Sequence, residues 1–227
     1  MKLVLRSLCL VVLMLTGCDD EPTQRRAFIE FLQTGIVDRT GVHIPIMKPD
    51  KAESFGPYAA HYQIILDFNA GFDLAPLERV ARLKGQITNL EDFAAHRDDL
   101  HALRDALPGL IATLHQRLAT ANAARVALQQ PADLQAVYDK AFDRVVTRPG
   151  MLTGKMLDLL PSSVDAMIAL ADYVADNPKI IRVSGMGGGS QDPDVQRHLA
   201  DLIEAIHRND EAADDLKRQF QALLSGT

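Results

Sequence analysis

The chain has 227 residues, of which 47% are hydrophobic, and it contains 30 Asp and Glu residues against 24 Lys and Arg residues. This composition is typical of a globular protein with one or two domains, and it excludes the disordered and collagen-like classes. A formal net charge of −6 argues against nucleic acid as a partner, because phosphate binding requires a basic surface.

The first 17 residues have the pattern of a secretory signal peptide. Lys2 and Arg6 accompany an apolar run over 8–15, which is shorter than the roughly 20 residues of a membrane-spanning helix and matches the apolar region of a signal. The segment 15–18 (LTGC) then resembles the bacterial lipobox, whose cysteine receives diacylglycerol. We therefore predict a lipoprotein signal peptide over 1–17. The alternative is an ordinary signal peptide that contains a cysteine.

Cys18 is the predicted lipid-attachment site and the predicted link to the membrane. Cleavage before it removes Cys9, the only other cysteine, so the mature chain would have neither a disulfide nor a reactive thiol. Stable anchoring takes at least two acyl chains, because one chain binds membranes only marginally. Asp19 follows directly and resembles the signal that retains lipoproteins in the inner membrane. This predicts the periplasmic face of the inner membrane rather than the outer membrane.

The mature chain is predicted to form one domain with almost no spacer. Residues 18–24 are expected to be the lipidated N-terminus and a short tether, and residues 25–227 a single helical domain. Apolar residues recur three and four positions apart from Phe28 to Ile36, which predicts a helix. The segment 40–49, with two prolines and a glycine, predicts a loop.

A second helical pattern follows, with Ser54 as its candidate N-cap and Pro57 in its first turn. It carries a stripe of mostly aromatic residues at helical spacing: Phe55, Tyr58, Tyr62, Ile65, Phe68 and Phe72. Such a stripe could line a ligand site, but it is far more often part of a core. We predict that it is buried.

The longest predicted helix runs from residue 88 to residue 130. Thr88 and Glu91 form a candidate capping box at its start. Leucines then recur at mostly three- and four-residue spacing, like the seam of a coiled coil: Leu100, Leu103, Leu107, Leu110, Leu114 and Leu118. Pro108 interrupts this seam. Because the apolar phase continues across the proline, we predict a kink and not a break.

Two more helices are predicted from proline signals. One begins at Pro131 and ends at 149–150 (PG), and the next runs from Pro161 to residue 177. The apolar, β-branched residues at 180–183 precede a glycine run, which predicts a short strand or a hairpin.

The last helix begins after the candidate N-cap Asp192 and extends to residue 224, unless Asn209 and Asp210 break it. Its uninterrupted length would exceed the size of a compact domain of this mass. The predicted fold is therefore mainly α: an elongated antiparallel helical bundle, with long coiled-coil-like helices and one short β-strand or hairpin near 180–189.

Four segments together resemble the YiaF-like bacterial lipoproteins, an envelope family whose domain has no assigned function. They are 24–33 (QRRAFIEFLQ), 55–58 (FGPY), 133–146 (DLQAVYDKAFDRVV) and 172–174 (DYV). Their order and approximate spacing match from residue 24 to about the start of the last helix. The resemblance implies a lipid-anchored, mainly helical periplasmic domain, and it supplies no catalytic or ligand-binding residues.

The sequence contains no motif for catalysis or metal binding that we recognise. His96 and His101 are five residues apart, and His198 and His207 are nine apart, so neither pair shares a helix face for one ion. The segment 185–190 (GMGGGS) lacks the Lys-Ser/Thr end of a phosphate-binding loop and the β-α-β unit of a dinucleotide site. We predict a protein that is not an enzyme, with no catalytic, cofactor-binding or metal-binding residue.

Two functions from different classes remain open. The favoured one is a membrane-anchored periplasmic lipoprotein with a non-catalytic role, which binds an unidentified envelope protein through its surface or has a structural role in the envelope. It is favoured because recognisable chemistry is absent, the helices carry heptad seams and the tether is short. The alternative is a small-molecule binding or sensor module, with a pocket between helices near the stripe over 55–72.

Overall fold

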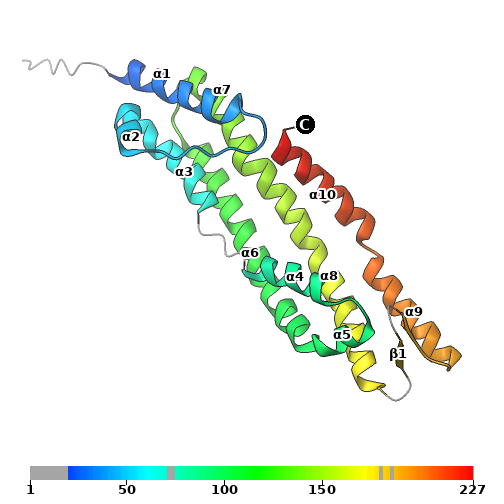
Figure 1. Ribbon diagram of the computed structural model, residues 1–227. Coiled ribbons are helices and arrows are strands. Elements are labelled where there is room, and N and C mark those ends of the chain that lie inside the picture. Colours follow the sequence, from blue (N-terminus) through cyan, green and yellow to red (C-terminus); the bar gives the residue numbers. More distant parts are fainter. Residues whose placement is uncertain (1–19, 71–74, 179–180, 185–186, 227) are drawn as a thin grey trace, which may run out of the picture.

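The computed structural model describes residues 20–70, 75–178, 181–184 and 187–226, and this part of the chain is mainly helical, as predicted (Figure 1). The α-helices, in chain order, are α1 (Glu21–Leu32), α2 (Pro49–Phe55), α3 (Ala59–Asn69), α4 (Ala75–Gln86), α5 (Leu90–Ala95), α6 (Arg97–Ala127), α7 (Ala132–Phe142), α8 (Arg148–Asp176), α9 (Pro193–His207) and α10 (Asp210–Ser225). The shorter elements are the π-helices η1 (Gln33–Val37) and η3 (Asp143–Thr147), the 3-10 helix η2 (Gly56–Tyr58), and the strands β1 (Arg182–Ser184) and β2 (Gly187–Gly189).

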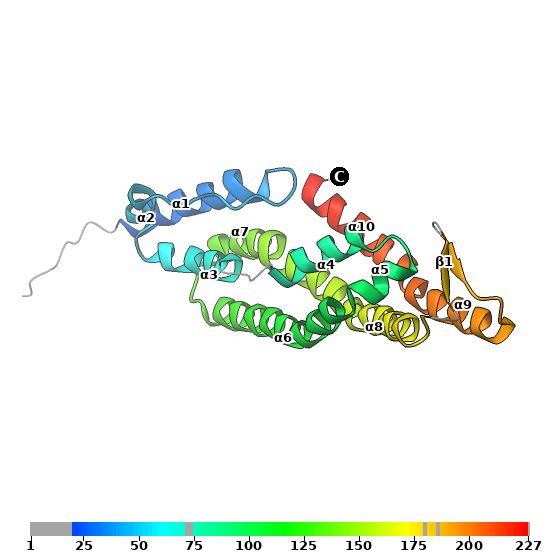
Figure 2. The same ribbon diagram turned by 60° about the horizontal axis from the view of Figure 1, so that its bottom comes forward.

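The molecule is elongated along two long helices that lie side by side, α6 and α8 (Figures 1 and 2). Helices α1, α2, α3 and α7 gather at the end where the chain enters, and α5, α9 and the two strands lie at the other end. Helix α10 then returns along α8. The far end is therefore separated from the N-terminal end by most of the length of α8, which is about 44 Å at 1.5 Å per residue.

The chain is helical without interruption from Ala132 to Asp176, so the predicted end at 149–150 is wrong. The π-helix η3 lies just before Pro149, and its wider turn removes the clash that a proline ring makes with the carbonyl four residues earlier. Pro161 also lies inside α8, although it was predicted to start a new helix. Leu157 and Val164, both buried, hold α8 in place on either side of it.

The start of α5 corrects the predicted capping box by one residue. Asn89 is the N-cap, and its side-chain oxygen accepts from the nitrogens of Glu91 and Asp92 at 2.9 and 3.1 Å. The Asp92 carboxylate accepts in return from the nitrogen of Asn89, at 3.2 Å. The predicted single helix over 88–130 is divided at His96 into α5 and α6 and ends at Ala127, although α6 continues through Pro108 as predicted. Most leucines of the predicted seam are buried.

The aromatic stripe is buried as predicted, although its helix begins differently. Ser54 lies inside α2, where its hydroxyl donates to the Lys51 carbonyl at 2.7 Å, so it does not cap the helix. Gly56 has a φ of 54° and ends α2, and η2 then leads into α3. The described members of the stripe, Phe55, Tyr58, Tyr62, Ile65 and Phe68, are all buried. Phe72 lies outside the described residues.

The C-terminal region consists of two helices and a small antiparallel pair of strands. β1 pairs with β2, Arg182 opposite Gly189 and Ser184 opposite Gly187. Asp192 caps α9 as predicted, since its carboxylate accepts from the nitrogen of Asp194 at 2.9 Å. The chain breaks between α9 and α10 at residues 208–209, so the last helix is not continuous.

The break is stabilised by a polar contact, because the Asn209 amide donates to the Ser162 hydroxyl on α8 at 2.7 Å. At its other end, α10 closes on Gly226, which has a φ of 75° and faces Gly41, with a φ of 71°. A Cβ on Gly41 would overlap the Leu224 carbonyl, and one on Gly226 would overlap the Gly41 nitrogen. Only glycine fits this crossing of the two backbones.

Three groups of buried side chains follow one another along the molecule. We call the largest the aromatic core: Phe28, Leu32, Ile36, Phe55, Tyr58, Tyr62, Ile65, Phe68, Leu110, Leu114, Ala121, Leu134, Tyr138, Ala141, Phe142, Val145, Val146 and Leu157. The middle group, the leucine core, joins α4, α6 and α8: Leu83, Leu100, Leu103, Leu107, Val164, Ile168 and Ala171. The tip core lies at the far end: Leu90, Leu170, Val174, Ile181 and Leu199.

Candidate binding site at the α8–α10 junction

The predicted lipid-attachment site Cys18 and the predicted retention signal Asp19 lie outside the described part of the chain. The described chain starts at Asp20 and α1 begins at Glu21, so the helical domain starts four residues earlier than the predicted position 25. Two residues, Asp19 and Asp20, separate Cys18 from the first residue of α1. No described helix is both long and apolar enough to cross a membrane.

The first turn of α1 is tied to its neighbours by polar contacts that we call the N-terminal latch. The Tyr58 hydroxyl donates to the Glu21 carboxylate. Arg25 lies between two carboxylates, with its Nε 3.8 Å from Glu21 and 3.5 Å from Asp133 on α7. Burial, and next the hydrogen bond to Glu21, raise the pKa of Tyr58 to about 12. The latch joins α1, η2 and α7 at the point where the chain enters the domain.

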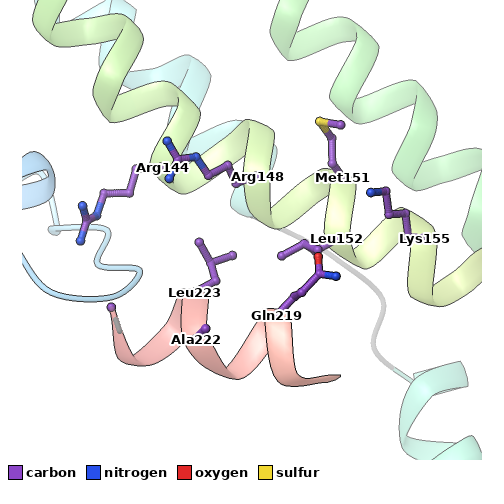
Figure 3. A pocket seen from close by; sticks show the side chains of 9 residues that line it. Arg144, Arg148, Met151, Leu152, Lys155, Gln219, Ala222 and Leu223 are labelled. Atoms are coloured by element: carbon purple, nitrogen blue, oxygen red, sulfur yellow. The ribbon is translucent and has the colours of Figure 1, made fainter. Parts of the chain in front are cut away.

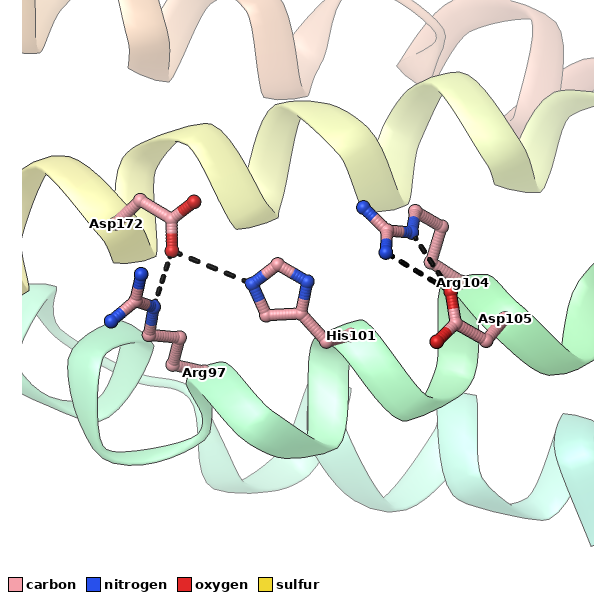
Figure 4. Close-up of polar contacts among 5 residues, drawn as sticks. All are labelled: Arg97, His101, Arg104, Asp105 and Asp172. Carbon is pink, nitrogen blue, oxygen red and sulfur yellow. Dashed lines mark hydrogen bonds and ion pairs between the residues drawn. The ribbon is translucent and has the colours of Figure 1, made fainter.

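Four of the histidines lie within 4 Å of a carboxylate: His96, His101, His115 and His207. No group of three or more potential metal-binding side chains lies together in the described residues. His101 and Arg97, about one turn apart on α6, both contact Asp172 on α8, the first with its Nε2 3.5 Å from the carboxylate (Figure 4). Nearby, Arg104 pairs with Asp105 at 3.0 Å. The two contacts of Asp172 join α6 to α8 across a partly exposed surface, whereas Arg104 and Asp105 both lie on α6.

A groove with a volume of about 570 Å³ lies between α8 and the end of α10 (Figure 3). We call it the basic groove, and it is lined by Arg144, Arg148, Met151, Leu152, Lys155, Gln219, Ala222, Leu223 and Gly226. Every charged lining residue is a cation, although the whole chain has a net charge of −6. Met151, which is 52% exposed, and the leucines supply an apolar surface between the cations. The groove thus combines positive charge with exposed apolar contacts.

The cations of the basic groove have different tasks. Arg144 donates to the carbonyls of Val37 and Gly41, at 3.3 and 3.0 Å, and to that of Arg39, so it holds the loop that follows η1. Arg148 is 65% exposed and pairs with Asp143 at 2.6 Å. Lys155 is exposed and lies one helical turn beyond Met151. Lys155 is therefore available at the surface for an acidic partner, Arg148 would have to exchange Asp143 for such a partner, and Arg144 is structural.

A second cavity lies between helices, with a volume of about 490 Å³, and we call it the apolar pocket. It is lined by residues of α3, α4, α6, α8 and α10: Phe68, Asn69, Val80, Ala81, Leu114, Pro149, Gly150, Thr153, Met156, Leu157, Leu160 and Phe220. None of these side chains is ionisable. The Asn69 amide nitrogen donates to the carbonyls of Ile65 and Val145, at 2.8 and 3.4 Å, so this nitrogen is satisfied within the protein.

Neither cavity was predicted residue by residue from the sequence. The signal for the basic groove is the spacing of Arg144, Arg148, Met151 and Lys155, which share one face of a helix. This face becomes visible only when the helix is known to continue through Pro149. With a helix end predicted at Pro149-Gly150, these four residues belonged to two separate segments, and the shared face could not be recognised.

A family model described as "Protein of unknown function (DUF3053)" matches residues 6–222 of the chain. Among curated proteins, "Uncharacterized protein YiaF" of Escherichia coli strain K12 is 30% identical over 192 residues, which cover 83% of this chain and 80% of that protein. The same protein of Shigella flexneri matches with the same identity and coverage. No solved structure matches the chain significantly.

Proposed function

We propose that this chain, which belongs to the DUF3053 family, is a non-catalytic lipoprotein of the bacterial envelope that binds another envelope protein through its basic groove. A lipid on Cys18 would hold it on the periplasmic face of the inner membrane. The observation that carries the proposal is the groove itself. It gathers cations and exposed apolar side chains on a chain that is acidic as a whole.

The chemistry of the groove defines the partner as a protein segment with both acidic and apolar side chains. Arg148 and Lys155 would pair with its carboxylates, and Met151 and Leu223 would contact its apolar residues. Opposite charges steer association and select the partner, and buried apolar contacts contribute affinity. The acidic remainder of the surface would repel an acidic segment that approached elsewhere.

The position of the anchor supports the same proposal. The N-terminal latch fixes α1 within three residues of Cys18, so the domain would be held close to the membrane by one end. The groove lies in the same half of the molecule, between the start of α8 and the C-terminal end of α10, and its Arg144 holds the loop that follows η1 (Figure 1). A lipid on Cys18 would therefore keep the groove near the membrane, within reach of envelope proteins at the membrane surface.

Site-specific photo-crosslinking in living cells tests the binding proposal. A photoreactive amino acid at Met151, inside the groove, should give a discrete crosslinked product that disappears when Lys155→Glu is added. The matched control is the same amino acid at Ile203, which is 38% exposed on α9. A product at Met151 that survives Lys155→Glu, or the same product from Ile203, would refute binding through the groove.

The anchor is tested separately. Labelled palmitate should be incorporated into the intact chain and not into Cys18→Ser, which should leave the membrane fraction. On a sucrose gradient the intact protein should sediment with inner-membrane markers, and replacing Asp19 by serine should move part of it to the outer membrane. Incorporation that is unchanged in Cys18→Ser, or an intact protein in the outer-membrane fractions, would contradict this part of the proposal.

A further inference from the structure

We propose that the apolar pocket is a binding site for the aliphatic chain of a lipid. This site is distinct from the basic groove, and the inference does not depend on the partner proposed for that groove. The pocket lies at the junction of five helices, which is a common position for ligand sites in helical bundles. Its volume of about 490 Å³ is within the range of small-molecule sites.

The lining specifies the chemistry of the ligand. Leu114, Leu157 and Phe68 are buried side chains of the surrounding helices, and they offer only apolar surface. Thr153 supplies the only hydroxyl among the lining residues, and Asn69 uses its amide nitrogen within the protein. A charged group inside this pocket would lose its hydration without gaining a charged partner among the lining residues. An uncharged hydrocarbon chain has no such cost.

The rim of the pocket indicates how a chain could enter. Met156 is 38% exposed, and it lines the pocket together with the partly buried Phe220 of α10. Exposed Met and Phe side chains around an apolar cavity are adaptable contacts for a flexible apolar ligand. The hydrocarbon chain of the lipid would lie inside the pocket, and the polar head group of the lipid would stay in water. Recognition of the lipid would then depend on its hydrocarbon chain and only weakly on its head group.

The width of the pocket depends on small residues. Gly150 faces it from α8, and a Cβ at this position would lie 3.1 Å from both Phe68 and Leu118, closer than side chains normally pack. Ala81 contributes a methyl group from the exposed side of α4. A large side chain at Ala81 would occupy the space without disturbing a buried contact. This position therefore offers a variant that blocks the pocket and keeps the fold.

Photolabelling of the full-length protein in inner-membrane vesicles tests the inference. The probe is a fatty acid with a diazirine in the middle of its chain, and the labelled peptides are mapped by mass spectrometry. We expect label on the α8 segment 149–160. Ala81→Trp should reduce this label at least tenfold, and the control Ala112→Trp, at an exposed alanine of α6 that does not line the apolar pocket or the cavity beside it, should not.

A phosphatidylcholine that carries the same diazirine chain identifies the source of the ligand. Label on 149–160 from both probes indicates a membrane phospholipid, and label from the free acid alone indicates a free fatty acid. Both results support the inference, provided that Ala81→Trp removes the label. The inference is overturned if neither probe labels this segment, or if the label is equal in Ala81→Trp and Ala112→Trp while both variants melt at the wild-type temperature.

Discussion

The two ends of the molecule are stabilised by different kinds of side chain. At the end where the chain enters, the aromatic core contains seven aromatic rings, and at the far end the tip core consists of five aliphatic residues. The tyrosines of the aromatic core also use their hydroxyls. Tyr62 donates to the Pro45 carbonyl at 2.6 Å and Tyr138 to the His61 carbonyl at 2.8 Å. Each such tyrosine buries a ring and also fixes a neighbouring segment.

This difference indicates which end of the molecule contributes more to the free energy of unfolding. Large buried rings with satisfied hydroxyls contribute more per residue than small aliphatic groups at the edge of a bundle. The end nearest the predicted anchor should therefore unfold last, and the end with α9 and the strands should open locally at lower cost. The following variants test this contrast in order of decreasing effect.

The largest effect is expected from truncating the aromatic core. Phe142 is fully buried between Tyr138 and the Arg125 guanidinium. Phe142→Ala should lower the free energy of unfolding by about 3–5 kcal/mol, because it removes apolar contacts and leaves a cavity. Chemical denaturation followed by circular dichroism measures this loss.

The matched variant at the far end is Leu199→Ala. It should have a smaller global effect than Phe142→Ala, because the tip core lies at the edge of the bundle and can relax. Hydrogen exchange should show faster exchange confined to α9 and the segment before it. An equal loss of stability in the two variants, or faster exchange throughout α1 and α7 in Leu199→Ala, would disprove the contrast.

Arg144→Ala should give the next effect. Its side chain donates to the carbonyl of Val37 at the end of η1 and to two carbonyls of the loop that follows, so its removal leaves partly buried acceptors without a charged donor. We expect a loss of about 1.5–3 kcal/mol in unfolding free energy. The control is Arg148→Ala on the same helix face, which loses one exposed ion pair and should change stability by less than about 1 kcal/mol. A reversed order would mean that Arg144 does not hold the loop.

The N-terminal latch predicts a smaller, pH-dependent effect. Tyr58→Phe removes the hydrogen bond to Glu21 and should lower stability by about 0.5–1.5 kcal/mol at neutral pH. The pKa of Tyr58 is about 12 in the folded protein against an ordinary 10, so the folded state favours the protonated phenol. The contribution of this pKa shift to the free energy of unfolding is complete below pH 10 and is lost as the pH rises toward 12. Stability should therefore fall less steeply over this interval in Tyr58→Phe.

The smallest effect concerns His61. Burial lowers its pKa, and its Nδ1 lies 2.9 Å from the Gln130 amide. The folded state favours the neutral ring. The contribution of His61 to the free energy of unfolding is therefore present above about pH 6.5 and is lost as the pH falls below this value. Unfolding free energies between pH 7 and pH 5 should decline less in His61→Gln than in the parent protein. Parallel profiles would show that His61 does not contribute.

Much of the fold followed from the spacing of apolar residues. The stripe that includes Tyr62 and the seam that includes Leu107 are buried because their period matches that of a helix, and this pattern reports packing directly. The predicted boundaries failed where local signals compete with packing. Pro149 and Pro161 have the chemistry of helix breakers, yet a π-turn before one and buried neighbours around the other keep the helix continuous.

The candidate site was less predictable than the fold. The basic groove needs Arg148 on α8 beside Leu223 on α10, and the apolar pocket needs Phe68 beside Phe220. These residues are far apart in the sequence, and the periodicity of apolar residues does not indicate which helices pack against one another. The break at Asn209 sets the path of α10, and it depends on a contact with Ser162 that only the folded chain reveals.

The meeting of Gly41 and Gly226 has a practical consequence for work with this protein. The C-terminal cap of α10 rests against a loop from the first part of the domain, so an affinity tag fused to the C-terminus would emerge from a crowded position beside the basic groove. Such a fusion could mask the very partner that it was meant to recover. An internal epitope near Ser190, at the opposite end of the molecule, would leave this junction undisturbed.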